Sequence, residues 1–168
     1  MIRLLLLRHA KTEDHGARPD FDRVLTDRGR RASPVIGAHM EMKGYRPDRV
    51  LCSPAVRARQ TLYLAATEIM SAPEIVFVPG LYNAEPEDYV EQITLFGEHA
   101  ETLLVVGHNP ATQDVAGLLV NTARSAVPLP SDYPTAALAV IEFDAANWAA
   151  MRERTGRLVD FVRPRDLD

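Results

Sequence analysis

Two arginines and two histidines stand at or shortly after the ends of apolar runs, where they could hold and process an anion. They are Arg8, His9, Arg57 and His108. Apolar runs of this length are typical of buried strands. Guanidinium groups bind phosphate oxygens through forked hydrogen bonds, and no carboxylate stands with these residues at the ends of the runs. Cationic donors without acids indicate an anion site, and phosphate is the anion that fits best.

Arg57 adds a second reason to expect an anion. It falls in the first turn of the helix that we expect after residue 53, where a cation opposes the positive end of the helix dipole. A bound anion would reverse the sign of that interaction, because the helix end and the guanidinium both attract it.

Other chemistries use similar residues, and the sequence disfavours them. Zinc bound by His9 and His108 is disfavoured because the neighbouring arginines repel a cation. A cysteine phosphatase is disfavoured because the spacing between Cys52 and Arg57 is too short for the phosphate loop of those enzymes. Nucleotide-binding glycine motifs are absent from the sequence. Histidine as the nucleophile remains, and we predict neither a metal nor a cofactor.

The two histidines need different protonation states for this chemistry. His9 must be neutral to attack phosphorus, and we expect its other ring nitrogen to be held by a nearby backbone carbonyl. His108 is expected to be protonated when a dianion is bound, since the anion favours the cation more strongly than the adjacent helix start disfavours it.

These residues require strands that end at one edge of a sheet. Strands are expected at 2–7, 49–52, 75–78, 102–106, 135–143 and 157–162. Helices are expected at 27–43, 53–70, 85–96, 109–120 and 145–154, the first of them kinked or restarted by a proline at position 34. Alternating strands and helices predict an α/β three-layer sandwich, with a mostly parallel central sheet, helices on both faces and an antiparallel pair at one edge. In such sheets, ligands bind beyond the carboxyl ends of the strands.

Length, composition and net charge limit the classes of protein to which this chain can belong. The 168 residues predict one domain spanning 1–168, and a single cysteine excludes an internal disulfide framework. The net charge of −4 disfavours a nucleic-acid partner, and no apolar run is long enough for a membrane span. The start of the chain lacks the pattern of a secretory leader, so we expect a cytoplasmic protein with no membrane partner.

Three blocks of this sequence resemble the signature of a known family, the histidine phosphatase superfamily with its phosphoglycerate mutase-like fold. Residues 8–11 read RHAK, where an alanine replaces the usual glycine. Residues 53–61 read SPAVRARQT, and residues 107–110 read GHNP. The short chain and the segments at 25–29, 81–84 and 134–138 are similar to the small SixA-type phosphohistidine phosphatases within that superfamily.

The resemblance implies roles for particular residues. His9 would be the nucleophile of a metal-independent phosphatase, and Arg8, Arg57 and His108 would hold the phosphoryl group. Independently of the resemblance, Lys11, His15, Arg18 and Arg23 lie in the loop after His9, where they could contact the rest of the substrate. Asn109 is a helix N-cap by position and could in addition orient the phosphate.

The sequence differs from that of the mutases in this family at the position of their general acid. Glu85 is displaced from the position of their acid and fits equally well as a first-turn residue of a helix. Without an acid, a leaving group that departs easily is favoured, and a phosphoramidate such as phosphohistidine on a protein fits better than a sugar phosphate. The alternatives are a phosphatase for small phosphomonoesters and a phosphate-reading module without catalysis. The expected partner is therefore a phosphorylated protein or a small phosphorylated substrate.

Overall fold

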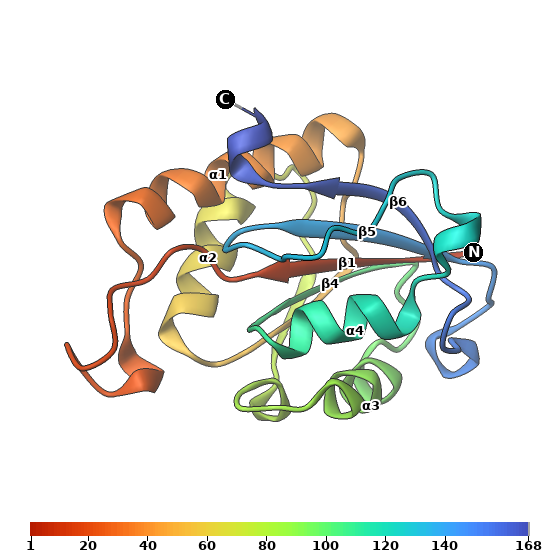
Figure 1. The fold of residues 1–168 in the computed structure, drawn as a ribbon, viewed down its shortest axis with the longest axis horizontal. Helices are drawn as coiled ribbons and strands as arrows, with labels where there is room; N and C mark the ends of the chain where they lie inside the picture. The colour runs from red at the N-terminus through yellow and green to blue at the C-terminus, as the bar shows by residue number, and fades with distance from the viewer. Residues whose placement is uncertain (168) are drawn as a thin grey trace.

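A six-stranded sheet forms the centre of the protein in the computed structural model, which describes residues 1–167 (Figure 1). The strands are β1 (Ile2–Arg8), β2 (Arg49–Cys52), β3 (Glu74–Phe77), β4 (Thr102–Gly107), β5 (Leu138–Phe143) and β6 (Arg157–Val162). Their order across the sheet is β3-β2-β4-β1-β5-β6. The first four pair in parallel, whereas β5 runs antiparallel to both β1 and β6.

Four helices cover the two faces of this sheet (Figure 1). They are α1 (Asp27–Lys43), α2 (Val56–Ala66), α3 (Pro86–Phe96) and α4 (Ala111–Leu119). The helices α1 and α2 pack together on one face, and α3 and α4 pack together on the other. The expected three-layer α/β fold, with an antiparallel pair at one edge, is therefore confirmed.

The leucines of β1 explain why that strand lies in the middle. Leu4 and Leu6 belong to the core beneath α3 and α4, and Leu5 and Leu7 belong to the core beneath α1 and α2. All four are fully buried, as expected for an apolar run whose side chains alternate between two covered faces.

Helix α1 shows local sequence signals at both ends. The hydroxyl of Thr26 accepts a hydrogen bond from the amide of Gly29, and Gly44 ends the helix in the left-handed conformation at φ 73°. The helix continues through Pro34, so it does not restart there.

Two of the expected helices differ from the structure. Helix α2 begins at Val56 rather than at Ser53. The Ser53 hydroxyl lies 2.7 Å from Nε2 of His108 and accepts from the amide of Ala55 at 3.3 Å, so it holds the turn before the helix rather than capping the helix itself. No helix spans 145–154. That segment forms a single turn at Trp148–Ala150, where the buried indole of Trp148 donates to the carbonyl of Ala100 and fixes the chain.

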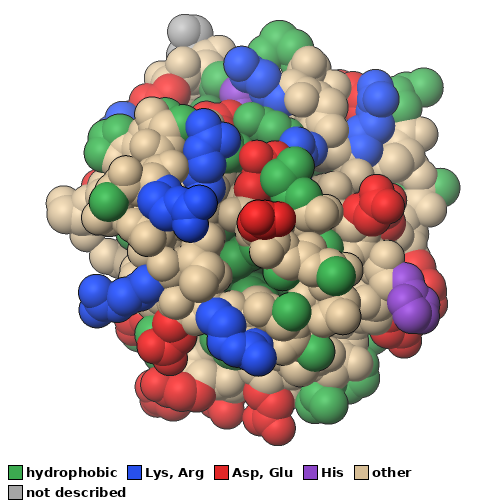
Figure 2. Space-filling model, turned by 90° about the vertical axis from the view of Figure 1, so that its right-hand side faces the viewer, with side chains coloured by type: hydrophobic (Ala, Val, Ile, Leu, Met, Phe, Trp, Pro, Cys, Tyr) green, Lys and Arg blue, Asp and Glu red, His purple; other side chains and the backbone are tan. Residues whose placement is uncertain are grey.

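The two ends of the sheet differ in character. Side chains of Lys and Arg are interspersed with those of Asp and Glu at the end where the parallel strands begin (Figure 2). At the other end, three strands stop within one residue of the same level: Arg8 pairs with Gly107, and Cys52 pairs with Val106. The residues that follow β1, β2 and β4 therefore emerge side by side. Within residues 1–167, none of the helices is both long and apolar enough to cross a membrane.

Two helical glycines differ in the space around them, so we expect opposite effects when each is replaced by alanine. Gly37 lies where α1 closely approaches α2, whereas Gly117 lies in α4. A Cβ at Gly37 would overlap the carbonyl oxygen of Ala65, whereas a Cβ at Gly117 meets no atom within 4 Å. We expect Gly37→Ala to lower the free energy of unfolding by about 1–3 kcal/mol through overpacking. Gly117→Ala should raise it by roughly 0.5–1 kcal/mol through helix propensity. Urea unfolding followed by circular dichroism measures both, and a neutral Gly37→Ala would contradict the packing described here.

Candidate active site

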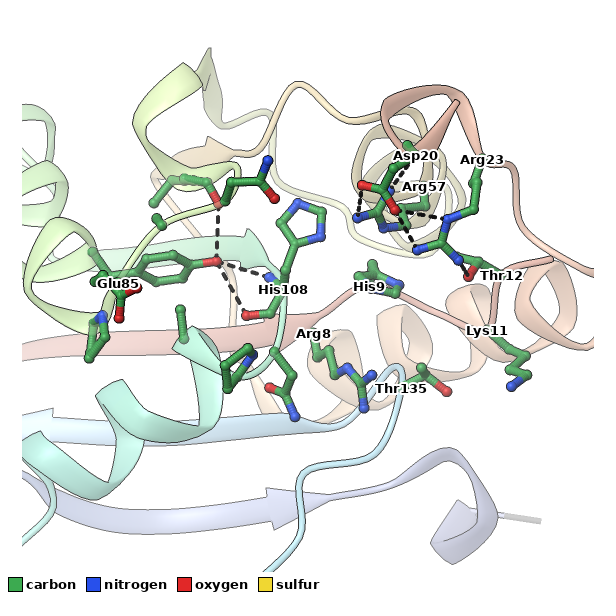
Figure 3. A pocket seen from close by; sticks show the side chains of 18 of the residues that line it. Arg8, His9, Lys11, Thr12, Asp20, Arg23, Arg57, Glu85, His108 and Thr135 are labelled. Atoms are coloured by element: carbon green, nitrogen blue, oxygen red, sulfur yellow. Dashed lines mark hydrogen bonds and ion pairs between the residues drawn. The ribbon is translucent and has the colours of Figure 1, made fainter. Parts of the chain in front are cut away.

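A cavity of about 600 Å³ opens at the carboxyl ends of the parallel strands (Figure 3). Nine of the ten residues that the sequence analysis selected line it: Arg8, His9, Lys11, His15, Arg23, Arg57, Glu85, His108 and Asn109. They come from the ends of β1 and β4, from the loop after β1, from the first turn of α2 and from the start of α3. The tenth, Arg18, lies outside the cavity lining and pairs with Glu13. Thr135 also lines the cavity, because the chain before β5 runs beside the end of β1.

His9 is oriented by backbone groups alone. Its amide donates to the carbonyl of Gly107 at 3.0 Å, and its Nδ1 lies 2.8 Å from the carbonyl oxygen of Ala10. A carbonyl only accepts hydrogen bonds, so Nδ1 carries the proton and Nε2 holds the free lone pair. The expected bond to a backbone carbonyl is thus present in the structure.

The environment keeps His9 neutral. Its pKa is lowered to about 3, first because burial disfavours the charged form, and then because His108, Arg57 and Arg8 add positive potential. The side chain is buried, with 7% of its surface exposed. At neutral pH, His9 is therefore a neutral imidazole, with its proton on Nδ1 and a free lone pair on Nε2.

His108 lies beside His9, with ring centroids 5.2 Å apart. Its Nε2 is 2.7 Å from the hydroxyl oxygen of Ser53, and its amide donates to the hydroxyl of Tyr89 at 2.9 Å. Burial, followed by the charge of Arg57, lowers its pKa to about 3, so the neutral ring predominates at pH 7. A dianion beside the ring would act in the opposite direction.

Neither Arg8 nor Arg57 uses all of its N–H donors in hydrogen bonds within residues 1–167. Arg8 donates through Nη1 to the carbonyl of Tyr133 at 2.9 Å, and Arg57 donates through Nη1 to the carbonyl of Asp20 at 2.7 Å. The Nε atoms of both arginines and Nδ1 of His108 are buried without a hydrogen-bond partner in residues 1–167. Buried donors without partners are costly. All three side chains line the cavity, where an oxyanion would compensate their charge and accept from the donors it can reach.

One carboxylate enters this cluster, contrary to the expectation of a site without acids. Asp20 lies in the long loop after β1 and accepts from Arg57 Nη2 at 3.2 Å (Figure 3). It also accepts from the hydroxyl of Tyr82 at 2.6 Å. Arg23 donates to its other oxygen through Nε at 3.1 Å. These contacts, led by the one from Tyr82, hold the pKa of Asp20 well below its usual range, so it is ionised. Loop residues follow no periodicity, so the sequence carried no signal for it.

The remaining candidates lie toward the rim. Figure 3 places Glu85 at the opposite end of the cavity from His9 and places Lys11 beyond Thr135. The amide of Glu85 donates to Asp88 Oδ2 at 2.8 Å, which is the hydrogen bond of a capping box at the start of α3. Asn109 donates to the carbonyl of Tyr133 at 3.0 Å and thereby ties the end of β4 to the chain before β5.

Two further residues position the histidines and were missed. Ser53, assigned to a helix cap from the sequence, is fully buried against His108. Its place one residue beyond the end of β2, within one residue of the level of His9 and His108, was the available signal. Tyr89 supports His108 from α3, and the neighbouring Gly107 has no room for a side chain because a Cβ would overlap the Tyr89 hydroxyl.

The donor set suits an anion better than a cation. Across residues 1–167, no three His, Cys, Asp or Glu side chains converge as metal ligands would. What the cavity offers is a neutral imidazole surrounded by guanidinium groups and a second imidazole. A nucleophile beside such donors can accept a phosphoryl group while its charge is stabilised.

Comparison with known proteins agrees with this geometry. The family model of the histidine phosphatase superfamily (branch 1) matches residues 4–94. The uncharacterised protein Rv1276c of Mycobacterium tuberculosis is 37% identical over 163 residues, covering 95% of this chain and 100% of that protein.

Solved structures extend the match to nearly the whole fold. A candidate phosphohistidine phosphatase SixA from Agrobacterium tumefaciens is 31% identical, with a TM-score of 0.77 over 97% of this chain and 98% of that chain. A SixA protein histidine phosphatase in complex with tungstate, 21% identical, shares the fold with a TM-score of 0.81 over 99% of this chain and 100% of that chain. The resemblance seen in the sequence is confirmed: this chain belongs to branch 1 of the histidine phosphatase superfamily and has the SixA-like fold of a phosphatase.

Proposed function

We propose that this phosphatase removes the phosphoryl group from phosphohistidine on a partner protein, through a covalent intermediate on His9. Nε2 of His9 attacks phosphorus as the P–N bond to the substrate imidazole breaks. That imidazole carries a proton on its other ring nitrogen, so it leaves with the electron pair of the P–N bond as a neutral ring. Water then attacks phospho-His9, both protons of the water leave with the phosphate as H2PO4−, and Nε2 of His9 regains its lone pair.

The protonation state of His9 is the observation that supports this proposal most directly. The bond to the Ala10 carbonyl fixes the proton on Nδ1, and burial keeps Nε2 free at neutral pH. A buried histidine with a structural role alone gains nothing from an unprotonated nitrogen beside two arginines. A nucleophile requires that arrangement.

Charge stabilisation in the proposal comes from the protein and not from a metal. The phosphoryl group in transfer carries negative charge on three oxygens. Arg8 and Arg57 supply guanidinium donors from two sides, and His108 supplies an imidazole N–H. Preorganised donors of this kind contribute several kcal/mol each to transition-state stabilisation, about 3–4 kcal/mol for a single oxyanion donor.

The carboxylates near the cavity support a phosphoramidate substrate. Asp20 is ionised and engaged by Tyr82, Arg57 and Arg23, so it holds no proton to donate at neutral pH. Glu85 stands at the start of α3, away from His9. An alkoxide leaving group needs an acid, whereas an imidazole is far less basic and departs more easily. The likeness to a SixA from Agrobacterium tumefaciens, described as a candidate phosphohistidine phosphatase, supports the same substrate.

Replacement of the nucleophile tests whether the protein is an enzyme of this kind. We expect His9→Ala to lower kcat for an aryl phosphate by more than about 10³-fold, because no covalent intermediate forms. A chelator should leave the wild-type rate unchanged. Steady-state kinetics measures both effects, with circular dichroism as the control for folding. Tight phosphate binding without turnover by the folded wild type would instead identify a phosphate-reading module.

The choice of leaving group tests the substrate. We expect a phosphohistidine peptide to be hydrolysed at least about 100-fold faster than a phosphoserine peptide of the same sequence, since that is the lower end of what a general acid contributes. Glu85→Gln should leave the phosphohistidine rate within about threefold. Phosphate release from each peptide measures the ratio. Equal rates would contradict the argument from the leaving group and favour a phosphatase for phosphomonoesters.

The lowered pKa values of His9 and His108 predict how stability depends on pH. A histidine that is neutral when folded stabilises the protein fully above its unfolded pKa of about 6.5, and this stability is lost as the pH falls toward 3. Each of the two should cost up to about 1.4 kcal/mol per pH unit below 6.5. Urea unfolding between pH 4.5 and 7.5 measures the loss.

A double variant serves as the matched control for that measurement. His9→Gln with His108→Gln removes both titrating rings, so its stability should fall less steeply with decreasing pH than that of the wild type. Parallel slopes, or an NMR titration midpoint of His9 between pH 6 and 7, would contradict the neutral imidazole.

A further inference from the structure

A second, shallower cavity of about 80 Å³ adjoins the candidate active site and shares Lys11 and Thr135 with it. Its walls come from the first half of α1, from the chain before β5 and from the segment after β6. Its charged lining is basic throughout: Lys11, Arg28, Arg163 and Arg165. Because the two cavities share Lys11 and Thr135, these four basic residues continue the lining of the active-site cavity away from His9, and we call them the basic track.

Most of this positive charge forms no ion pair with a carboxylate among residues 1–167. Arg163 is engaged by Asp166 through two contacts of 3.0 Å. The ion pairs among residues 1–167 leave out Lys11, Arg28 and Arg165. The neighbouring carboxylate of Asp27 pairs with Arg30 rather than with Arg28. Asp166 is a counter-ion for Arg163 and also lies within reach of the charge of Arg165. The cations of this cavity still outnumber the carboxylate beside them, and such an excess makes a surface complementary to acidic groups.

The position of Arg28 strengthens this argument. It lies in the first turn of α1, where a cation is repelled by the positive end of the helix dipole. An anion at the second cavity would be attracted by the helix end and by the guanidinium together. The opposite end of the molecule shows no such segregation, since both signs of charge are interspersed there (Figure 2).

We infer that this basic track binds an acidic segment of the partner protein, next to its phosphorylated residue. The inference rests on the proposed function, because it places the rest of a protein substrate beside the phosphoryl group in the active site. A small phosphomonoester would not extend from His9 to Arg28 and Arg165. Carboxylates of a polypeptide, spaced at about 3.3 Å per residue in an extended chain, can follow such a track.

Three phosphohistidine peptides of equal length, flanked by glutamates, glutamines or lysines, test the inference. For the wild type, KM should increase in that order, with similar kcat. The preference should collapse at 1 M salt, where the Debye length shrinks to about 3 Å. Equal KM values for the three peptides at low salt would overturn the inference.

Charge-reversal variants test whether the preference for acidic peptides depends on Arg28 and Arg165. Arg28→Glu with Arg165→Glu should raise KM for the glutamate peptide about tenfold, because two exposed attractions become repulsions, and should leave kcat/KM for an aryl phosphate unchanged. Folding is not at risk from Arg28→Glu, since an acid in the first turn suits the helix dipole. Arg124→Glu, an exposed arginine at the opposite end of the molecule, is the matched control and should change neither value. An unchanged peptide preference in the double variant would refute the assignment to this track.

Binding measured without turnover separates this inference from the proposed function. The unphosphorylated glutamate peptide should shift the NMR amide signals of Arg28 and Arg165, and the glutamine peptide should not. If these shifts occur while no phosphohistidine peptide is hydrolysed, the proposed function fails and the docking track stands. If all three peptides are hydrolysed alike without the shifts, the track fails and the proposed function stands. Saturation of the same amides by inorganic phosphate at a lower concentration than by the peptide would reassign the cavity to a simple anion and overturn the inference.

Discussion

Parallel pairing of β1 and β2 with β4 is the constraint on which the site depends. The amide of His9 is held by the carbonyl of Gly107, and the amide of Ser53 by the carbonyl of Val106, each at 3.0 Å. These two bonds set the ends of three strands within one residue of the same level, so that His9, Ser53 and His108 lie close together. A slip of register in either pair would separate the residues and turn their side chains to the other face of the sheet.

Asp20 balances the charge that this convergence creates. Burying two guanidinium groups beside two imidazoles is unfavourable unless acceptors are near. The loop after β1 supplies a carbonyl and a carboxylate to Arg57, while Arg23 and Tyr82 hold the carboxylate in place. The contact also docks the loop over the site. A phosphoryl group that approaches Arg57 therefore meets a guanidinium that is already oriented, with Nε still uncommitted.

Most of the architecture follows from local patterns in the sequence. The apolar run of β1, the Thr26 cap and Gly44 at the end of α1 are signals that depend only on neighbouring residues. Because parallel strands present their carboxyl ends together, the convergence of Arg8, His9 and His108 could be predicted from strand ends alone. The start of α2 and the segment around Trp148 could not, because a contact with another part of the chain overrode the local preference. Asp20 was beyond prediction for the same reason: its partners come from three separate segments.

Tyr89 links α3 to the end of β4 through a single hydroxyl group, against which Gly107 lies too close for any side chain. The two positions are therefore mutually dependent across the sheet–helix boundary. A relative that carries a larger residue at 107 must give up the tyrosine and find another acceptor for the His108 amide. Substitutions at these two sites should accordingly occur together in evolution, although residue 89 lies in helix α3 and residue 107 lies at the end of strand β4.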